Sequence, residues 1–382
     1  MRLSDSSPEK ISLSDLALTL VAKSAGFKHS LPAAMQSSLA DAVRAMNCYY
    51  SNLIEGHDTH PIDIERALQG DYSNDHKKRE LQLEAKSHIA VQAWIDAGGL
   101  RGRVYTRDAL CEIHQRFYEN LSANLLITTD PLTQESIKIV PGKLRHRDVK
   151  VGQHVAVSAG AVPRFLTRFE TAYGECGQLE SLLALAASHH RLLWIHPFLD
   201  GNGRVARLLT HAILSEKLDT GGLWSLSRGF ARQVQLYKQH LAACDMTKRN
   251  DLDGRGHLSQ EALIDFTRWT LETAIDQVDF MQKLMEPSRL RARILLWAKE
   301  EIAMNHLPPQ TITVLEALLY RGEVGRGEMA ALLNVSDRHA RRLLSPLAKL
   351  GILVSDEPKS ALKLGFPAAL ASRWMPGLFP MS

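Results

Sequence analysis

The chain has 382 residues, enough for two or three domains, and 45% of its residues are hydrophobic, enough for buried cores. Its net charge of +4 arises from 46 basic and 42 acidic residues. So small an excess does not indicate a chain that binds nucleic acid over its whole length.

The four cysteines, at positions 48, 111, 176 and 244, contain no Cys-x-x-Cys pair. Neither a zinc site nor a disulfide framework is therefore indicated. The first residues lack the apolar core of a signal peptide, and no apolar run is long enough to span a membrane. These features predict a cytoplasmic protein without membrane contact.

The chain is expected to begin with helices over residues 11–56, because apolar residues recur there at helical spacing. Gly56 favours a helix C-terminus at the end of this segment. Ser51 and Glu55 are one turn apart and therefore lie on one helix face. A second helical pair over residues 61–99 is expected to end at Gly98-Gly99.

A helix over residues 106–120 is predicted next, followed by a short β-hairpin and a helix over residues 161–174. Apolar and polar residues alternate on both sides of Pro141-Gly142, which favours a hairpin with its turn there. Val149 and Val151 belong to the second predicted strand.

The most specific segment runs from His196 to Arg207 and reads His-Pro-Phe-Leu-Asp-Gly-Asn-Gly-Arg-Val-Ala-Arg. Helical periodicity precedes it and resumes after it. A Gly-Asn-Gly turn that leads into a helix predicts an anion site, because unpaired backbone N–H groups and the positive end of the helix dipole converge there. The glycines allow the backbone to approach phosphates closely.

The side chains of this segment predict phosphate chemistry. His196 titrates near neutrality and can act as a general base. Asp200 can hold a Mg²⁺ ion that also bridges phosphates. Arg204 and Arg207 can each bind phosphate oxygens with two N–H groups, and Phe198 is expected to anchor the loop.

The C-terminal part is predicted to be a separate unit. A connector helix occupies residues 286–306, and a winged helix-turn-helix occupies residues 307–382. Its candidate recognition helix carries basic side chains where contacts to phosphates and bases would be made, at Arg338, Arg341 and Arg342. Residues 307–382 hold nine Lys/Arg against six Asp/Glu. This modest excess leaves DNA binding, dimerisation and protein docking open.

The segment 196–207 resembles the signature of the Fic (filamentation induced by cAMP) family, His-x-Phe-x-Asp/Glu-Gly-Asn-Gly-Arg-x-x-Arg, at every defined position. The resemblance implies a protein adenylyltransferase, which moves AMP from ATP to a Ser, Thr or Tyr hydroxyl of a target protein and releases pyrophosphate. By this resemblance His196 deprotonates the hydroxyl and Asp200 carries Mg²⁺ (or Mn²⁺). The nucleotide is then held by the turn and the arginines, at Gly201, Asn202, Gly203, Arg204 and Arg207, with Arg207 on the γ-phosphate.

Ser51-Asn52-Leu53-Ile54-Glu55-Gly56 resembles the inhibitory motif of the same family, Ser/Thr-x-x-x-Glu-Gly/Asn. The resemblance implies that Glu55 reaches Arg207 and restrains the enzyme, with the inhibitory helix at about 40–56. It also implies that the hairpin is a flap that docks the target by strand addition, through Pro141, Gly142, Val149 and Val151. Tyr237 takes the position of a family tyrosine near the adenine, or simply packs.

The resemblance implies a mainly all-α fold, with a Fic-type helical core, a β-hairpin flap and a C-terminal winged helix-turn-helix. The expected domains are an N-terminal helical region at 1–104, a catalytic core at 105–285, the connector and the winged helix. A homodimer and self-modification are also expected. One alternative is a DNA-binding regulator whose Fic-like domain senses nucleotide or modifies the protein itself. AMP removal and transfer of another nucleotide are further alternatives.

Overall fold

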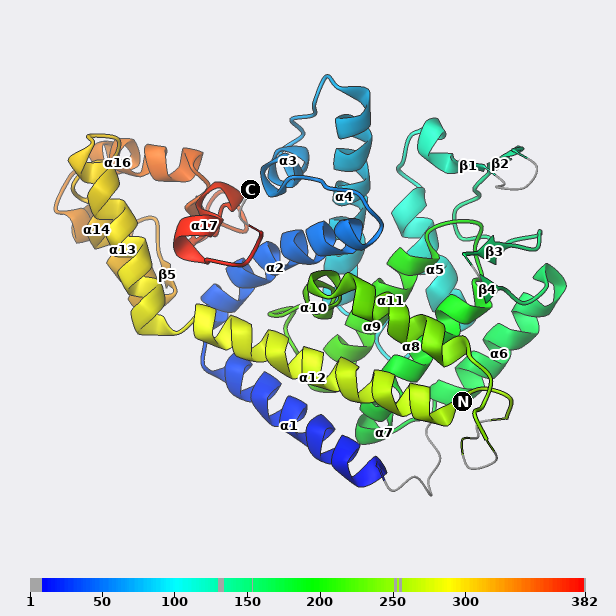
Figure 1. Ribbon diagram of the computed structural model, residues 1–382. Coiled ribbons are helices and arrows are strands. Elements are labelled where there is room, and N and C mark those ends of the chain that lie inside the picture. Colours follow the sequence, from blue (N-terminus) through cyan, green and yellow to red (C-terminus); the bar gives the residue numbers. More distant parts are fainter. Residues whose placement is uncertain (1–8, 130–133, 153, 251–252, 254–255, 381–382) are drawn as a thin grey trace. The chain divides into compact units, whose positions relative to one another are not determined.

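A computed structural model describes residues 9–129, 134–152, 154–250, 253 and 256–380. These residues are mainly helical, as predicted (Figure 1). They divide into two compact units. Unit 1 comprises Met1–Ala25, Asn47–Thr220 and Ser225–Gln277, and unit 2 comprises Gly26–Met46, Gly221–Trp224 and Val278–Ser382.

These units do not follow the predicted domain boundaries. Residues 26–46 group with the C-terminal part of the chain and not with an N-terminal domain. Within unit 2, Gly322 packs against the side chains of Pro32 and Ala34. A Cβ atom added to Gly322 would lie 3.3 Å from the Cβ atom of each of these residues. Tertiary packing of this kind joins segments that are distant in sequence, and helical periodicity alone contains no information about it.

The first helices are α1 (Lys10–His29), α2 (Ala33–Ile54), α3 (Pro61–Leu68) and α4 (His76–Asp96). Helix α2 begins earlier than the predicted 40 and ends at Ile54, so Glu55 and Gly56 lie in the turn that follows. Gly56 has a φ of 86°, which a residue with a side chain rarely adopts. Glycine at this position therefore ends the helix directly after the predicted inhibitory segment.

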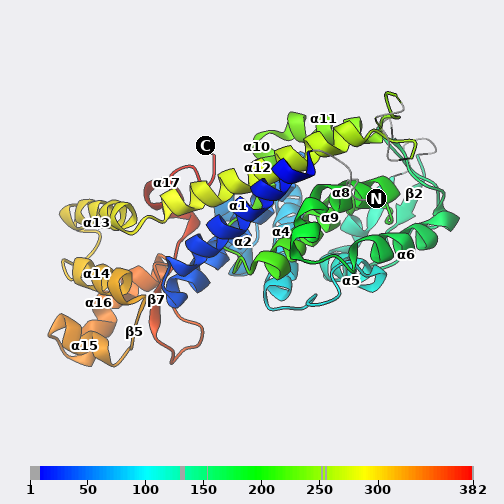
Figure 2. The ribbon, with the colours of Figure 1, turned by 90° about the horizontal axis from the view of Figure 1, so that it is seen from below.

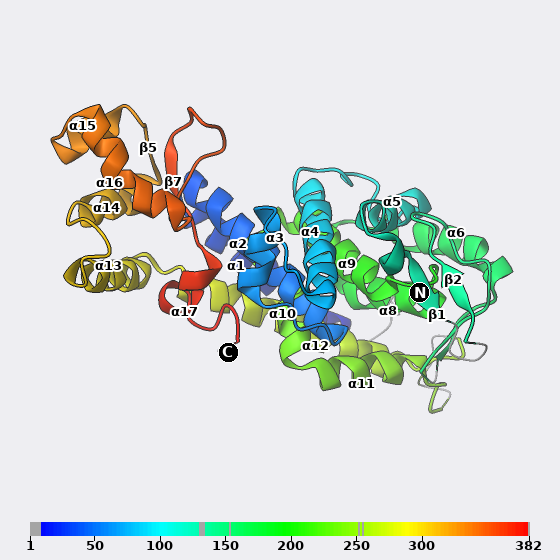
Figure 3. The same cartoon turned by 90° about the horizontal axis from the view of Figure 1, so that it is seen from above.

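The rest of unit 1 is helical apart from short strands. Its further helices are α5 (Arg107–Tyr118), α6 (Val162–Tyr173), α7 (Gln178–Leu183), α8 (Leu185–Ile195), α9 (Asn202–Leu218), α10 (Leu226–Arg232), α11 (Val234–Asp245) and α12 (Gln260–Leu284), the last of which continues into unit 2, with 3-10 turns at Ala123–Leu126 and Ala159–Ala161. Helix α9 contacts α4, α5, α7 and α8, and Figure 3 shows it between α4 and α8. Because α9 is enclosed on several sides, its residues are buried along most of its length.

The predicted hairpin across Pro141-Gly142 is wrong. Strand β2 (Ser136–Lys138) pairs with the earlier β1 (Ile127–Thr129), and β3 (Lys150–Val151) pairs with β4 (His154–Val155). The segment between the two pairs turns inward. Gly142 donates its backbone N–H to His114 Nδ1 at 2.9 Å, and Ile139 is buried. Both alternating segments contain a strand, as predicted, but the two strands do not pair with each other. The partner of β2 precedes it in the chain, and the partner of β3 follows it.

Unit 2 contains the connector helix α13 (Pro287–Ala303), close to the predicted 286–306. It also contains α14 (Thr311–Arg321), β5 (Glu323–Val324), α15 (Glu328–Leu333), α16 (Asp337–Lys349), β6 (Leu353–Val354), β7 (Leu362–Leu364), a 3-10 turn at Ala368–Leu370 and α17 (Ala371–Trp374). The three strands form an antiparallel sheet in the order β5-β7-β6. Strands β6 and β7, which follow α16, are thus paired with each other. Among the described residues, no helix combines the length and apolar character needed to cross a bilayer.

Candidate active site

The loop between α8 and α9 is held in shape by its own residues. The Asn202 side chain accepts a hydrogen bond from the Phe198 N–H at 3.0 Å and donates one to the Phe198 carbonyl at 2.9 Å. The Phe198 ring is fully buried and stacks on His114 at a centroid distance of 4.1 Å. Phe198 therefore anchors the loop, as predicted. The Asn202 side chain thus holds the loop closed, and the place of Asn202 in the nucleotide site stays a prediction.

The two glycines of the turn are required for different reasons. Gly201 has a φ of 76°, and a Cβ on it would lie 2.7 Å from the Tyr118 ring. A Cβ on Gly203 would lie 2.4 Å from Glu55 Oε1. No side chain caps the start of α9, so the first N–H groups of this helix face the same space as the Glu55 carboxylate. The helix start predicted to bind an anion is thus uncapped, and a carboxylate of the chain itself lies over it.

His196 has the geometry of a base. Its Nδ1 lies 3.3 Å from the Leu193 carbonyl oxygen, which can only accept a hydrogen bond. Nδ1 therefore carries the proton, and Nε2 keeps its lone pair. Burial, with a smaller contribution from the positive charge of Arg145, lowers the pKa of His196 to about 4, although the hydrogen bond to the Leu193 carbonyl acts in the opposite direction. The imidazole is therefore neutral at physiological pH.

We expect the pH dependence of kcat/KM to reflect this depressed pKa. A base with an ordinary histidine pKa of about 6.5 loses activity as the pH falls through that value. Because the neutral form of His196 persists to lower pH, kcat/KM should decline only as the pH approaches 4. The measurement is kcat/KM from pH 4 to 9, with circular dichroism at each pH to show that the protein is folded. A midpoint near 6.5 would contradict the burial argument.

Arg145 fixes the backbone at His196, a role that the sequence did not indicate. His196 has a φ of 51° and a ψ of 63°, the left-handed conformation that residues with side chains adopt at a cost. The buried guanidinium of Arg145 donates a hydrogen bond to the His196 carbonyl at 2.7 Å. The backbone N–H of Arg145 donates another to the Pro197 carbonyl at 2.9 Å. The guanidinium also donates to the carbonyl oxygens of Arg147, Val157 and Ile195.

Asp200 lies beside the anion site and is exposed. Its Oδ2 accepts a hydrogen bond from the Tyr118 hydroxyl at 2.8 Å, which orients the carboxylate. An exposed and oriented carboxylate of this kind fits a hard cation such as Mg²⁺, which prefers oxygen ligands. Among the described residues, no group of three or more His, Cys, Asp or Glu side chains is arranged to hold a metal ion. A metal ion at Asp200 would therefore need ligands from outside the chain.

The predicted pairing of Glu55 with Arg207 is present. Arg207 is buried, and it donates to Glu55 Oε1 at 2.5 Å and to Ser51 Oγ at 2.8 Å. Burial by itself would raise the pKa of Glu55, but the charge and hydrogen bond of Arg207 outweigh this and lower it. Glu55 is therefore ionised at neutral pH, and Arg207 is occupied by the segment that ends α2.

Arg204 is held by Glu84, a second residue that the sequence did not indicate. Arg204 donates to Glu84 Oε2 at 2.9 Å, and both side chains are more than nine-tenths buried. His57 Nδ1 lies 3.3 Å from the same oxygen, and its hydrogen bond to Glu84 raises the pKa of His57. Arg204 was predicted to bind phosphate, yet its guanidinium joins α9 to α4. A charged residue on the buried face of α4 was the signal that could have revealed Glu84.

Tyr237 is buried, whereas the residues predicted to form the flap are partly buried or exposed. The Tyr237 ring is buried and stacks on Phe230 at 4.6 Å, and its hydroxyl lies 2.7 Å from His189 Nε2. These contacts show a packing role for Tyr237, and its place near adenine stays a prediction. Among the flap residues, Pro141, Gly142 and Val149 are partly buried and Val151 is exposed. Docking of a target by these residues also stays a prediction.

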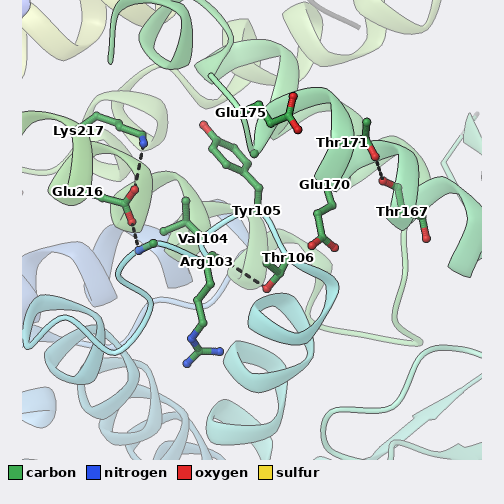
Figure 4. A pocket seen from close by; sticks show the side chains of 12 residues that line it. Arg103, Val104, Tyr105, Thr106, Thr167, Glu170, Thr171, Glu175, Glu216 and Lys217 are labelled. Carbon is green, nitrogen blue, oxygen red and sulfur yellow. Dashed lines mark hydrogen bonds and ion pairs between the residues drawn. The ribbon is translucent and has the colours of Figure 1, made fainter. Parts of the chain in front are cut away.

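A hollow of about 540 Å³ lies elsewhere in unit 1 (Figure 4). Glu216 and Lys217 near the C-terminal end of α9 line it, together with Tyr105 and Glu170. Glu216 follows Gly203 by 13 residues along α9. At a rise of 1.5 Å per helical residue, the hollow therefore lies about 20 Å from the start of α9. Neither His196 nor the arginines of the loop contribute to its lining. The candidate active site is therefore the start of α9.

Comparison with protein families identifies a domain that contains this loop. Residues 104–214 match the model of the Fic/DOC family. The Protein adenylyltransferase Fic of Drosophila grimshawi is 27% identical over 188 residues, which cover 49% of this chain and 36% of the fly protein. The protein of the same name from Culex quinquefasciatus is 28% identical over 192 residues, covering 49% and 35%. The chain thus spans about a third of the length of these relatives.

Solved structures show the same fold. A Fic family protein from Desulfovibrio desulfuricans G20 superposes with a TM-score of 0.53 at 17% identity, covering 95% of this chain and 98% of that one. Residues 134–508 of Fic-1 from C. elegans superpose with a TM-score of 0.55 at 17% identity, covering 73% and 74%. At these identities the likeness concerns the fold alone.

Proposed function

The chain is a Fic family protein with its Fic domain at residues 104–214, and on this premise we propose that it transfers AMP from ATP to a hydroxyl side chain of a target protein. The observation that carries the proposal is the neutral His196, with its Nε2 lone pair, next to the uncapped start of α9. A base and an anion site on one loop suit attack on a phosphate by a hydroxyl.

In the proposed reaction the backbone N–H groups of the turn and the freed Arg207 bind the polyphosphate of ATP, and Asp200 would hold the Mg²⁺ ion. The ion neutralises phosphate charge when it is bound. His196 Nε2 takes the proton of the target hydroxyl as its oxygen forms a bond to the α-phosphorus. The bond from the α-phosphorus to the oxygen shared with the β-phosphate breaks, and pyrophosphate leaves. Positioning and charge neutralisation supply most of such a rate enhancement.

We further propose that the protein is self-restrained. Glu55 occupies both Arg207 and the space over Gly203, the two features that would receive phosphates. A carboxylate that remains there competes with an incoming anion by charge and by volume. Productive binding of ATP therefore requires the turn after α2 to move or the carboxylate to be displaced.

The test is label transfer from ATP labelled at the α-phosphate, with Mg²⁺ and the Glu55→Gly chain. The expected result is label on the chain itself or on a protein of a cell extract, and none with the Glu55→Gly/His196→Ala chain. ATP labelled at the γ-phosphate is the control for kinase activity and should leave protein unlabelled. Absence of α-label despite measured ATP binding would refute AMP transfer. GTP, CTP and UTP, and loss of label from pre-labelled protein, then test the related reactions.

A further inference from the structure

The second and third helices of unit 2 after the connector form a helix-turn-helix. Helix α15 ends at Leu333, three residues turn, and α16 begins at Asp337 (Figure 2). Asn334 in the turn has a φ of 51°, a left-handed conformation that asparagine tolerates well. The two helices contact each other and α14, and β6 follows α16 and contacts it. In such a motif the second helix is the one that can enter a DNA groove.

The outer face of α16 is basic and polar. Ala340 and Leu347 are buried against the rest of the unit. The exposed positions of α16 include four basic residues at helical spacing, Arg338, Arg341, Arg342 and Lys349, together with Asp337, Ser345 and Ala348. In the described residues of α16, no large apolar side chain is strongly exposed, and the first one beyond its end is Leu350 at 48%. A face without aromatic or aliphatic anchors is poorly suited to a protein partner.

The arginines of this face are not neutralised within the chain. Among the described residues, Arg338, Arg341 and Arg342 make no ion pair, whereas Arg321 pairs with Glu328 and Lys363 pairs with Asp356. The Arg326 guanidinium is engaged with neutral groups, because it donates hydrogen bonds to the Ser355 hydroxyl and the Ser360 carbonyl. The exposed carboxylate nearest in sequence is Asp337, on the same helix, and the next nearest, Glu328 and Asp356, are paired with Arg321 and Lys363. Three adjacent unpaired guanidiniums therefore remain available to an external anion.

The strand pair after α16 adds a second candidate contact. Strands β6 and β7 pair with each other, and Arg326 ties the segment between them at both of its ends. Lys359 is exposed in that segment. A fixed loop that presents a cation beside a basic helix can contact the backbone of the same duplex.

We propose that α16 and the β6–β7 segment bind double-stranded DNA, with α16 in the major groove. The groove is wide enough for an α-helix, and arginine can bind both phosphate oxygens and the O6/N7 edge of guanine. This activity is independent of AMP transfer, because none of its residues belongs to the loop between α8 and α9.

The test is fluorescence anisotropy of the full chain with a labelled 30-base-pair duplex pool, over a series of salt concentrations. The variant is Arg338→Gln/Arg341→Gln/Arg342→Gln. The matched control, Lys283→Gln/Arg289→Gln/Lys299→Gln, removes the same charge from exposed positions on α12 and α13 of unit 2. The expected result is loss of duplex binding at least ten-fold in the variant only. The log–log salt slope should become shallower by up to about 2.7, at roughly 0.9 per lost phosphate contact.

Several results would overturn the proposal. They are no binding of the wild type at low salt, equal loss in the control variant, and displacement of the duplex by poly-glutamate as effectively as by unlabelled duplex. The last result would indicate an acidic protein partner. Thermal unfolding of both variants shows whether they fold. Label transfer from ATP in the Glu55→Gly background should be the same with and without the three arginines, which separates this proposal from the proposed function.

Discussion

Replacing Glu55 with glycine is expected to raise the rate of AMP transfer by about 10- to 100-fold. The change removes the 2.5 Å hydrogen bond to Arg207 and clears the space over Gly203. A hydrogen bond between charged groups contributes about 1.5–3 kcal/mol, and each 1.4 kcal/mol corresponds to about ten-fold in a rate or a binding constant. The gain should appear mainly as a lower KM for ATP, because Arg207 becomes free to bind phosphate.

Glu55→Gln separates charge from volume. The amide keeps the shape of the side chain and can still accept a hydrogen bond from Arg207, but it repels phosphate less. Its rate should therefore lie between those of the wild type and Glu55→Gly. The matched control is Glu119→Gly, since Glu119 is also exposed and directly follows the last residue of a helix, α5. A Gly variant no faster than the wild type would contradict the restraint, and a Gln variant equal to Gly would contradict the role of volume.

Replacing Arg145 with methionine is expected to lower kcat by about ten-fold or more while the KM for ATP changes little. The guanidinium holds the His196 carbonyl, so without it the left-handed conformation at His196, which costs about 1–2 kcal/mol, can relax. The imidazole would then leave its position beside the anion site. Arg145 is thus a positioning residue and touches no reacting atom.

Two measurements distinguish positioning from a general loss of structure. The positive charge of Arg145 helps to lower the pKa of His196, so the acid limb of the pH profile should move to higher pH in Arg145→Met. Arg145→Lys should restore little, because an ammonium cannot reach several carbonyl oxygens in a fixed plane. Arg147→Met, two residues away and partly exposed in a pair with Glu135, is the control. An unshifted profile with a lower melting temperature would indicate a purely structural role.

The course of the loop between α8 and α9 was predictable from the sequence because its parts are local. The base, the carboxylate, the glycine turn and the arginines lie within twelve residues. Their relative positions follow from one helix end, one turn and one helix start. The contact between Glu55 and Arg207 spans 152 residues, and only the family resemblance made it predictable. The main error, the hairpin at Pro141-Gly142, arose because alternation identifies a strand without identifying its partner.

Tertiary structure decided what each side chain of the signature does. By sequence Arg204 and Arg207 are equivalent candidates for binding phosphate. In the fold, α4 brings the buried Glu84 to one arginine, and the end of α2 brings Glu55 to the other. The residue type and spacing of a charged group determine what it can bind. Which partner it has is settled by packing between distant elements, because a buried charge is stable only where the fold supplies its counter-charge.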